Sequence, residues 1–248
     1  MFAEYSIAPG SILVAGDSIL KGVSYDEKRK RLVLLKESFC TEAAKLLRPA
    51  VENISRFGLK SGELFTLLYE KLQKILKSGE QLPSLVLIEI GGNDCDFDWD
   101  AVANEPKAAH FPNTALSEYS NNLERIITLV KDAGSQPVLC NLPPIDADRY
   151  FLSISKNEPS RAKRLLEFLG EVGRIYWWHE RYSAALSRIA QATRTPLLLF
   201  REAILATDDY RKHISGDGLH LNCSGHAALL KTVLEYISQY APSLLNKS

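Results

Sequence analysis

The sequence predicts an α/β protein built around a central five-stranded parallel sheet. Short apolar runs typical of strands alternate along the chain with longer segments in which apolar residues recur at helical spacing. Strands that alternate with helices favour a parallel, doubly wound sheet. The run at residues 85–90, Leu-Val-Leu-Ile-Glu-Ile, is almost entirely apolar, as is typical of a central strand covered on both faces.

The first half of the chain is expected to supply three of the strands. They are expected at residues 12–16, 51–55 and 85–90. A charged hairpin is expected at residues 21–36, and helices at residues 37–47 and 61–77. The second of these helices is amphipathic, because one of its faces carries Leu64, Leu67, Leu68, Leu72 and Ile75.

The second half is expected to add two strands and three helices. The strands are expected at residues 137–141 and 197–200, and the helices at residues 116–133, 175–193 and 227–240. Residues 95–113 are rich in Asp, Asn and Pro and are expected to be irregular, and residues 145–173 form a charged insertion. No repeat, low-complexity tract or linker interrupts the pattern, so residues 1–248 are expected to form a single domain.

The composition fits a globular protein without a polyanionic partner. The chain has 248 residues, of which 46% are hydrophobic, so it can bury a full-sized core. Thirty basic and thirty acidic residues balance, which argues against a nucleic acid or an anionic membrane surface as partner. A small molecule is the expected partner.

Four cysteines and the N-terminus bear on the compartment. Cys40, Cys95, Cys140 and Cys223 are far apart and form no Cys-x-x-Cys pair, which favours reduced thiols over a zinc site. The N-terminus has no basic region followed by a signal-like apolar run, and no segment reaches the roughly 18 apolar residues of a membrane span. A cytoplasmic protein is the expectation.

Four short motifs stand at the ends of expected strands or before expected helices. They are Gly16-Asp-Ser18, the segment from Asn53 to Gly62 that contains Gly58, Gly91-Gly-Asn-Asp94, and Asp217-Gly-Leu-His220. In this order they resemble the signature blocks of the SGNH (GDSL-type) hydrolase superfamily, which is esterase- and lipase-like. The resemblance spans residues 11 to about 230. It implies a flavodoxin-like three-layer α/β/α sandwich, the SGNH hydrolase fold.

The motifs contain the residues of a serine nucleophile and its base. A Ser hydroxyl needs a base within hydrogen-bond reach, and His220 is the candidate for that base of Ser18. Asp217, three residues earlier, can orient the imidazole and stabilise its charged form. The resemblance implies the same two roles for Asp217 and His220.

The resemblance also implies three donors for the oxyanion of an acyl-transfer intermediate. They are the backbone N–H groups of Ser18 and Gly58 and the side-chain amide of Asn93. Gly58 suits close backbone approach because it has no Cβ, and Asn93 follows a buried strand directly.

No metal or cofactor is expected. Five acidic residues have the spacing of a calcium-binding loop: Asp94, Asp96, Asp98, Asp100 and Glu105. Trp99 occupies the position where such a loop needs Gly, so a solvated acidic loop is the preferred interpretation and calcium stays open. The sequence contains no Gly-x-Ser-x-Gly elbow, phosphate-binding loop or His-Glu-x-x-His motif.

Two segments are expected to border the active-site cleft. Residues 95–113 and 145–180 follow the third and fourth strands, and loops at that sheet edge surround the ligand in such folds. Their aromatic and His side chains either line the cleft or pack the insertion onto the body. These candidate substrate-binding residues are Trp99, His110, Tyr150, Trp177, Trp178 and His179.

The expected function is therefore metal-independent hydrolysis of carboxylic esters through an acyl-enzyme. The resemblance alone favours short acyl groups, such as acetyl, on a carbohydrate or small metabolite. Lysophospholipase, thioesterase and peptidase-like activities stay open. An alternative of another class is a non-catalytic α/β binding module that uses the same cleft, in which Ser18 and His220 would lie beyond hydrogen-bond range.

Overall fold

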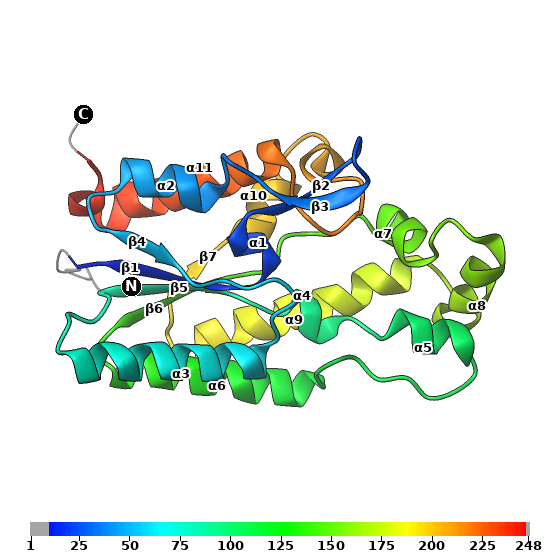
Figure 1. The fold of residues 1–248 in the computed structure, drawn as a ribbon, viewed down its shortest axis with the longest axis horizontal. Coiled ribbons are helices and arrows are strands. Elements are labelled where there is room, and N and C mark those ends of the chain that lie inside the picture. Colours follow the sequence, from blue (N-terminus) through cyan, green and yellow to red (C-terminus); the bar gives the residue numbers. More distant parts are fainter. Residues whose placement is uncertain (1–9, 247–248) are drawn as a thin grey trace.

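A computed structural model describes residues 10–246, in which a parallel sheet carries helices on both faces (Figure 1). The strands are β1 (Ile12–Gly16), β4 (Val51–Asn53), β5 (Leu85–Glu89), β6 (Gln136–Cys140) and β7 (Leu197–Leu198). All neighbours are parallel, and the order across the sheet is β4-β1-β5-β6-β7. This order is flavodoxin-like and confirms the predicted fold class. Its switch point lies between β1 and β5, where ligands bind beyond the carboxyl ends of the strands.

Two layers of helices cover the sheet (Figure 1). One face packs against α2 (Phe39–Leu46), α10 (Phe200–Leu205) and α11 (Cys223–Tyr240), and the other against α3 (Ser61–Ser78), α6 (Leu116–Asp132) and α9 (Gly173–Ala192). The apolar stripe predicted for α3 is real, because Leu64, Leu68, Leu72 and Ile75 are buried. The helix ends at Gly79, whose φ of +70° is a left-handed conformation that glycine adopts without strain.

A hairpin and two short 3₁₀ helices lie outside the main sheet. The expected hairpin is present as β2 (Val23–Asp26) and β3 (Arg31–Leu34), which pair antiparallel. Two helical turns of the 3₁₀ type are η1 (Tyr210–His213) and η2 (Pro242–Leu244). The last helix begins at Cys223, earlier than predicted, because the Asn222 side chain accepts hydrogen bonds from the N–H groups of Ser224 and Gly225.

Part of the chain expected to be irregular is helical. Residues 95–113 contain the end of α4 (Gly92–Cys95) and all of α5 (Trp99–Asn104), so that prediction was wrong in part. The Asp98 carboxylate starts α5, because its Oδ1 accepts the N–H groups of Asp100 and Ala101. An Asp-rich composition therefore marked a helix cap here as well as a loop.

The last strand is shorter than expected. It ends at Leu198, and Phe200 opens helix α10 instead of continuing the strand. The Phe200 ring is fully buried and packs edge-on against Phe39 of α2. The N–H of the next residue, Arg201, donates to Asn141 Oδ1 and not to a neighbouring strand.

The charged insertion forms a second, smaller core at one end of the sheet. It contains α7 (Ala147–Ile154) and α8 (Pro159–Leu169), which lie with α5 at the right of Figure 1. Phe97, Val102, Phe151, Leu165 and Ile175 are buried together there. The insertion is thus a packed helical wall next to the carboxyl ends of the strands.

Within residues 10–246, no helix is long and apolar enough to cross a membrane. The expectation that the chain has no signal sequence concerns residues 1–9, which lie outside the residues that the structure describes. Cys40, Cys95 and Cys140 are buried, Cys223 is exposed, and all four are free thiols.

Candidate active site

The turn after β1 places Ser18 at the switch point of the sheet. Strand β1 ends at Gly16, where a Cβ would lie 2.2 Å from the carbonyl oxygen of Glu89 on the neighbouring strand, so only glycine fits. Asp17 then caps the short helix α1 (Ser18–Lys21) by accepting the N–H of Ile19 at 2.9 Å. Ser18, the first residue of that helix, is buried and lines a small cavity.

Ser18, His220 and Asp217 form a continuous hydrogen-bonded series. Ser18 Oγ lies 3.0 Å from His220 Nε2, and His220 Nδ1 lies 2.6 Å from Asp217 Oδ2. The other carboxylate oxygen of Asp217 accepts from Ser215 Oγ and from the N–H groups of Leu219 and His220. An imidazole held between a hydroxyl and a carboxylate can take the hydroxyl proton and remain charged there.

The environment keeps Asp217 ionised. Burial raises the pKa of its carboxyl, but the hydrogen bond and charge of His220, together with two backbone amides, outweigh burial and hold the pKa below its usual range. The Phe57 ring lies nearly parallel to the His220 imidazole, with ring centres 6.4 Å apart, and is 60% exposed. Phe57 thus covers the outer side of the imidazole.

The three sequence-predicted oxyanion donors lie in different surroundings. Ser18 and Asn93 line the same small cavity, and Gly58 does not line it. Asn93 Nδ2 donates to Asp17 Oδ2 at 3.2 Å and to the carbonyl of Leu59 at 3.1 Å. Gly58 has a φ of +69° and no atom within 4 Å of the position of a Cβ, so its backbone is open to approach.

Two buried carboxyls lie beside Ser18. Asp17 and Glu89 are 2% and 1% exposed and line the same small cavity. Burial raises the pKa of Asp17 to about 6, against the hydrogen bonds from Ile19 and Glu89. Burial, together with the charge of Asp17, raises the pKa of Glu89 well above its usual range. Sequence reasoning missed Glu89, although a carboxyl in an otherwise apolar strand is a usable signal.

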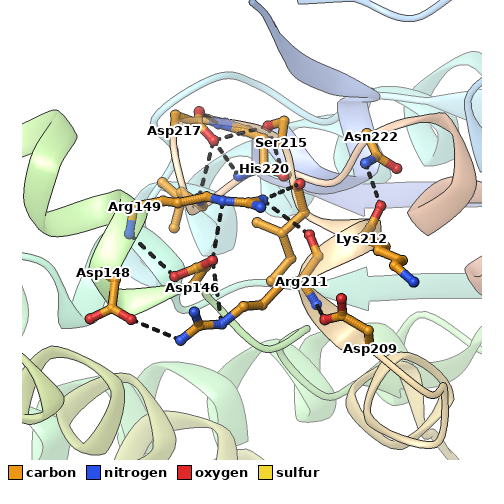
Figure 2. A network of polar contacts seen from close by, with 12 residues as sticks. Asp146, Asp148, Arg149, Asp209, Arg211, Lys212, Ser215, Asp217, His220 and Asn222 are labelled. Carbon is orange, nitrogen blue, oxygen red and sulfur yellow. Dashed lines mark hydrogen bonds and ion pairs between the residues drawn. The ribbon is translucent and has the colours of Figure 1, made fainter.

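A network of side chains fixes the loop that carries Asp217 and His220 (Figure 2). Arg149 on α7 donates from Nη1 to the carbonyls of Arg211 and Ile214, at 3.0 and 3.1 Å. Its Nε lies 3.3 Å from Asp146 Oδ2, and the N–H of Asp146 donates to the carbonyl of Gly218 at 2.8 Å. The insertion therefore holds the loop that carries Asp217 and His220. No local sequence pattern predicted this role.

Gly218 packs directly against the backbone of helix α7 in the insertion. Its φ is +78°, and a Cβ would lie 2.2 Å from the backbone nitrogen of Tyr150 on α7. Both the conformation and the space therefore require glycine between Asp217 and His220.

Two neighbouring cavities share lining residues, and Ser18 lines the smaller one. The small one has a volume of about 20 Å³, and a larger one of about 220 Å³ extends under the insertion. Gly92, Ile145, His179 and Leu219 line both. Of the predicted substrate-binding residues, five line the larger cavity: Trp99, His110, Tyr150, Trp178 and His179. Trp177 does not line it and is 49% exposed.

His179 is the unusual polar group of these cavities. It is 5% exposed, and burial, with the charge of Arg201, lowers the pKa of its imidazole to about 3. Its Nδ1 has no hydrogen-bond partner among residues 10–246. A neutral imidazole therefore borders both the Ser18 cavity and the aromatic one.

The acidic residues with calcium-like spacing have different protein partners. Asp94 accepts from Ser61, Asp96 from Trp99 and Tyr150, and Asp98 caps α5. Asp100 pairs with Lys156 and Arg161. Across the described residues, no three His, Cys, Asp or Glu side chains are grouped as for a metal ion.

Comparisons with known proteins agree with this geometry. A sequence profile described as the GDSL-like Lipase/Acylhydrolase family matches residues 14–228. No curated protein matches the sequence significantly.

Solved structures share the fold at low sequence identity. A lipase/acylhydrolase from Enterococcus faecalis is 20% identical with a TM-score of 0.60, over 96% of this chain and 98% of that one. A variant of an acetyl-xylooligosaccharide esterase from Geobacillus is 17% identical with a TM-score of 0.62, over 94% and 96%.

A psychrotrophic esterase from Pseudoalteromonas, inhibited by monoethylphosphonate, is 16% identical with a TM-score of 0.56, over 95% of this chain and 100% of that one. These similarities show the fold. The profile match covers most of the sequence, and the chain belongs to the GDSL-like lipase/acylhydrolase family.

Proposed function

We propose that this chain is a single-domain, metal-independent serine hydrolase that cleaves carboxylic esters through an acyl-enzyme. Ser18 is the nucleophile, His220 the base and Asp217 the residue that orients the imidazole. The observation that carries the proposal is the unbroken series from Ser18 Oγ through the His220 ring to Asp217, with gaps of 3.0 and 2.6 Å.

The reaction has two halves, acylation and deacylation, and in each half His220 takes up a proton and then gives it to the leaving group. Ser18 Oγ attacks the ester carbonyl carbon while its proton moves to His220 Nε2, and the alcohol then leaves with that proton. In deacylation water is the nucleophile and Ser18 the leaving group. Water gives a proton to His220 and attacks the acyl carbon, and Ser18 takes the proton from His220 as the acid departs. The backbone N–H groups of Ser18 and Gly58 and the Asn93 amide stabilise the oxyanion of both intermediates. Asn93 Nδ2 has two N–H donors, which bond Asp17 and the carbonyl of Leu59, so it exchanges one of these bonds for the oxyanion.

The substrates that we propose are short acyl esters, such as acetyl esters, of a carbohydrate or another small metabolite. The cavity beside Ser18, about 20 Å³, holds a group of the size of one water molecule or methyl. The neighbouring cavity of about 220 Å³, which shares four lining residues with it, is then available to the rest of the substrate. That one structural neighbour is an acetyl-xylooligosaccharide esterase is consistent with this assignment.

A thioesterase- or lysophospholipase-type activity differs by placing a long acyl chain in the larger cavity. The aromatic rings of Phe97, Trp99, Phe168 and Trp178 favour apolar groups there. The two assignments therefore predict opposite dependence of the rate on acyl-chain length. A non-catalytic binding module requires Ser18 and His220 to lie apart, and their distance of 3.0 Å argues against it.

Four free thiols support the proposal of a reducing, cytoplasmic compartment, and the absence of excess positive charge supports a small-molecule partner.

The test is hydrolysis of p-nitrophenyl acetate, butyrate and octanoate by the wild type and Ser18→Ala, with and without a chelator. We expect chelator-resistant activity that falls from acetate to octanoate and is lost in the variant. Activity that rises toward octanoate would replace the short-acyl assignment by the long-chain one. Equal activity of Ser18→Ala would contradict Ser18 as nucleophile.

A further inference from the structure

Glu89 is a buried carboxyl whose role the triad does not explain. It ends β5, is 1% exposed, and is the register partner of Gly16, the residue before Asp17. Its Oε2 has no hydrogen-bond donor among residues 10–246. A carboxylate that is ionised, buried and without a donor is strongly disfavoured, so Glu89 in this position needs to carry a proton.

The carboxylate of Asp17 is placed to accept a hydrogen bond from the O–H of protonated Glu89. Asp17 follows Gly16, the register partner of Glu89, and the two side chains line one small cavity with Ser18, where their carboxyl groups can share a hydrogen bond. Both oxygens of Asp17 already accept: Oδ1 from the N–H of Ile19 at 2.9 Å, and Oδ2 from Asn93 Nδ2 at 3.2 Å. These are acceptor bonds, which an ionised Asp17 makes best.

We propose that Glu89 is a positioning residue, a neutral carboxylic acid whose O–H donates a hydrogen bond to the Asp17 carboxylate. Through Asp17 it holds the Ser18 turn and the Asn93 amide in place for ester hydrolysis. The inference rests on the proposed roles of Ser18 and Asn93. A neutral Glu89 stabilises the Asp17 carboxylate with a hydrogen bond and adds no second negative charge beside the developing oxyanion.

The other titratable groups around this pair fit the same arrangement. Burial above all, and then the charge of Asp17, raise the pKa of Glu89. Burial also raises the pKa of Asp17, against the hydrogen bonds from Ile19 and Glu89. The charge of His220 favours ionised Asp17, and that of Asp94 disfavours it. Other groups that face the pair are neutral side chains on the adjoining elements: Cys95, Tyr119, Cys140 and His179. No lysine or arginine in the described residues makes an ion pair with Asp17 or Glu89.

The test compares Glu89→Gln with Glu89→Leu. Gln keeps the shape and an N–H donor but has no proton to lose, whereas Leu removes the donor. We expect Glu89→Leu to lower kcat by about 10- to 100-fold with little change in KM, because the reacting groups are misplaced and substrate binding is not. Glu89→Gln should recover at least about tenfold of that loss, which is about 1.4 kcal/mol of barrier. Its kcat should also lack the decline at alkaline pH that ionisation of Glu89 causes in the wild type.

Infrared spectroscopy tests the proton directly and needs no esterase activity. The spectrum of the wild type minus that of Glu89→Gln should contain the carbonyl stretch of a neutral carboxylic acid at neutral pH. If that band is missing from the difference spectrum, or if Gln is as impaired as Leu, the inference is overturned.

A wild type with the band but without activity toward any ester would refute the proposed function and leave the proton on Glu89 in place. If Glu89→Leu does not fold, as judged by circular dichroism, the Gln variant and the infrared band still decide.

Discussion

Ser18 Oγ and His220 Nε2 lie 3.0 Å apart although 202 positions separate them in the chain. The first belongs to the turn after β1, and the second to a loop just before the last helix. Asp17 caps the Ser18 turn, and Arg149 bonds the carbonyls of the loop that carries His220 (Figure 2). This contact therefore depends on the fold that brings the two ends of the chain together.

Asp217→Asn should reduce kcat by roughly 10⁴-fold while leaving the fold intact, because an amide no longer fixes the required imidazole tautomer or stabilises its charge. The measurement is kcat for p-nitrophenyl acetate, with circular dichroism as a check of folding. Asp208→Asn, on an exposed residue of a nearby loop, is the matched control and should behave as wild type. Comparable rates for the two variants would contradict the role of Asp217.

Asn93→Ala should lower kcat by about 10²- to 10³-fold with a small change in KM, as expected when one oxyanion donor is removed. The side chain also bonds Asp17 and Leu59, so thermal unfolding needs to be recorded beside the kinetics. Asn121→Ala, on an exposed position of α6, serves as control. A rise in KM without loss of kcat would assign Asn93 to substrate binding instead.

Arg149→Met should lower kcat about tenfold and leave KM nearly unchanged, because the loop with Asp217 and His220 loses two hydrogen bonds to its carbonyls. Lys156→Met removes an exposed ion pair with Asp100 on the same insertion and is expected to have no effect on kcat. Steady-state kinetics of both variants make the comparison. Identical kcat values would show that the clamp does not position the loop.

Stability should fall as the solution is acidified from about pH 6.5 toward pH 4. Burial lowers the pKa of His226 from 6.5 to about 4, and that of His179 to about 3. The unfolded chain takes up protons on both imidazoles below pH 6.5, whereas the folded chain does not. Stability from neutral burial is therefore present above that pH and is lost below it, on the order of a few kcal/mol per imidazole.

Urea unfolding at pH 7.0 and pH 5.0 measures this loss. His226→Gln should show a smaller decrease between the two values than the wild type, and His110→Gln, on a half-buried residue, should show the same decrease as the wild type. An unchanged decrease in His226→Gln would mean that His226 does not contribute to the acid sensitivity.

The strands and the triad candidates were predictable because their signals are local. The apolar run of β1 ends directly at Gly16-Asp-Ser18, and Asp217 and His220 share one short segment. The fold class followed from the alternation of strand and helix patterns. Position at the end of a strand then placed Ser18 and Asn93 at one edge of the sheet.

The remaining features depend on contacts between distant segments. Arg149 reaches carbonyls 62 and 65 positions away, and Glu89 meets Asp17 only because β1 and β5 are neighbours in register. Residues from Phe200 on follow a short strand but form a helix, and the Phe200 ring packs there against Phe39 of the distant helix α2. No window of sequence contains these relationships.

Covalent labelling of Ser18 is the most direct test of the proposed acyl-enzyme chemistry. The folded protein is treated with a fluorophosphonate, which reacts with activated serines, and the modified peptide is identified by mass spectrometry. Wild type, Ser18→Ala and heat-unfolded wild type are compared. We expect one adduct, on Ser18, in the folded wild type alone. An adduct on another residue, or equal labelling of folded and unfolded protein, would contradict Ser18 as the activated nucleophile.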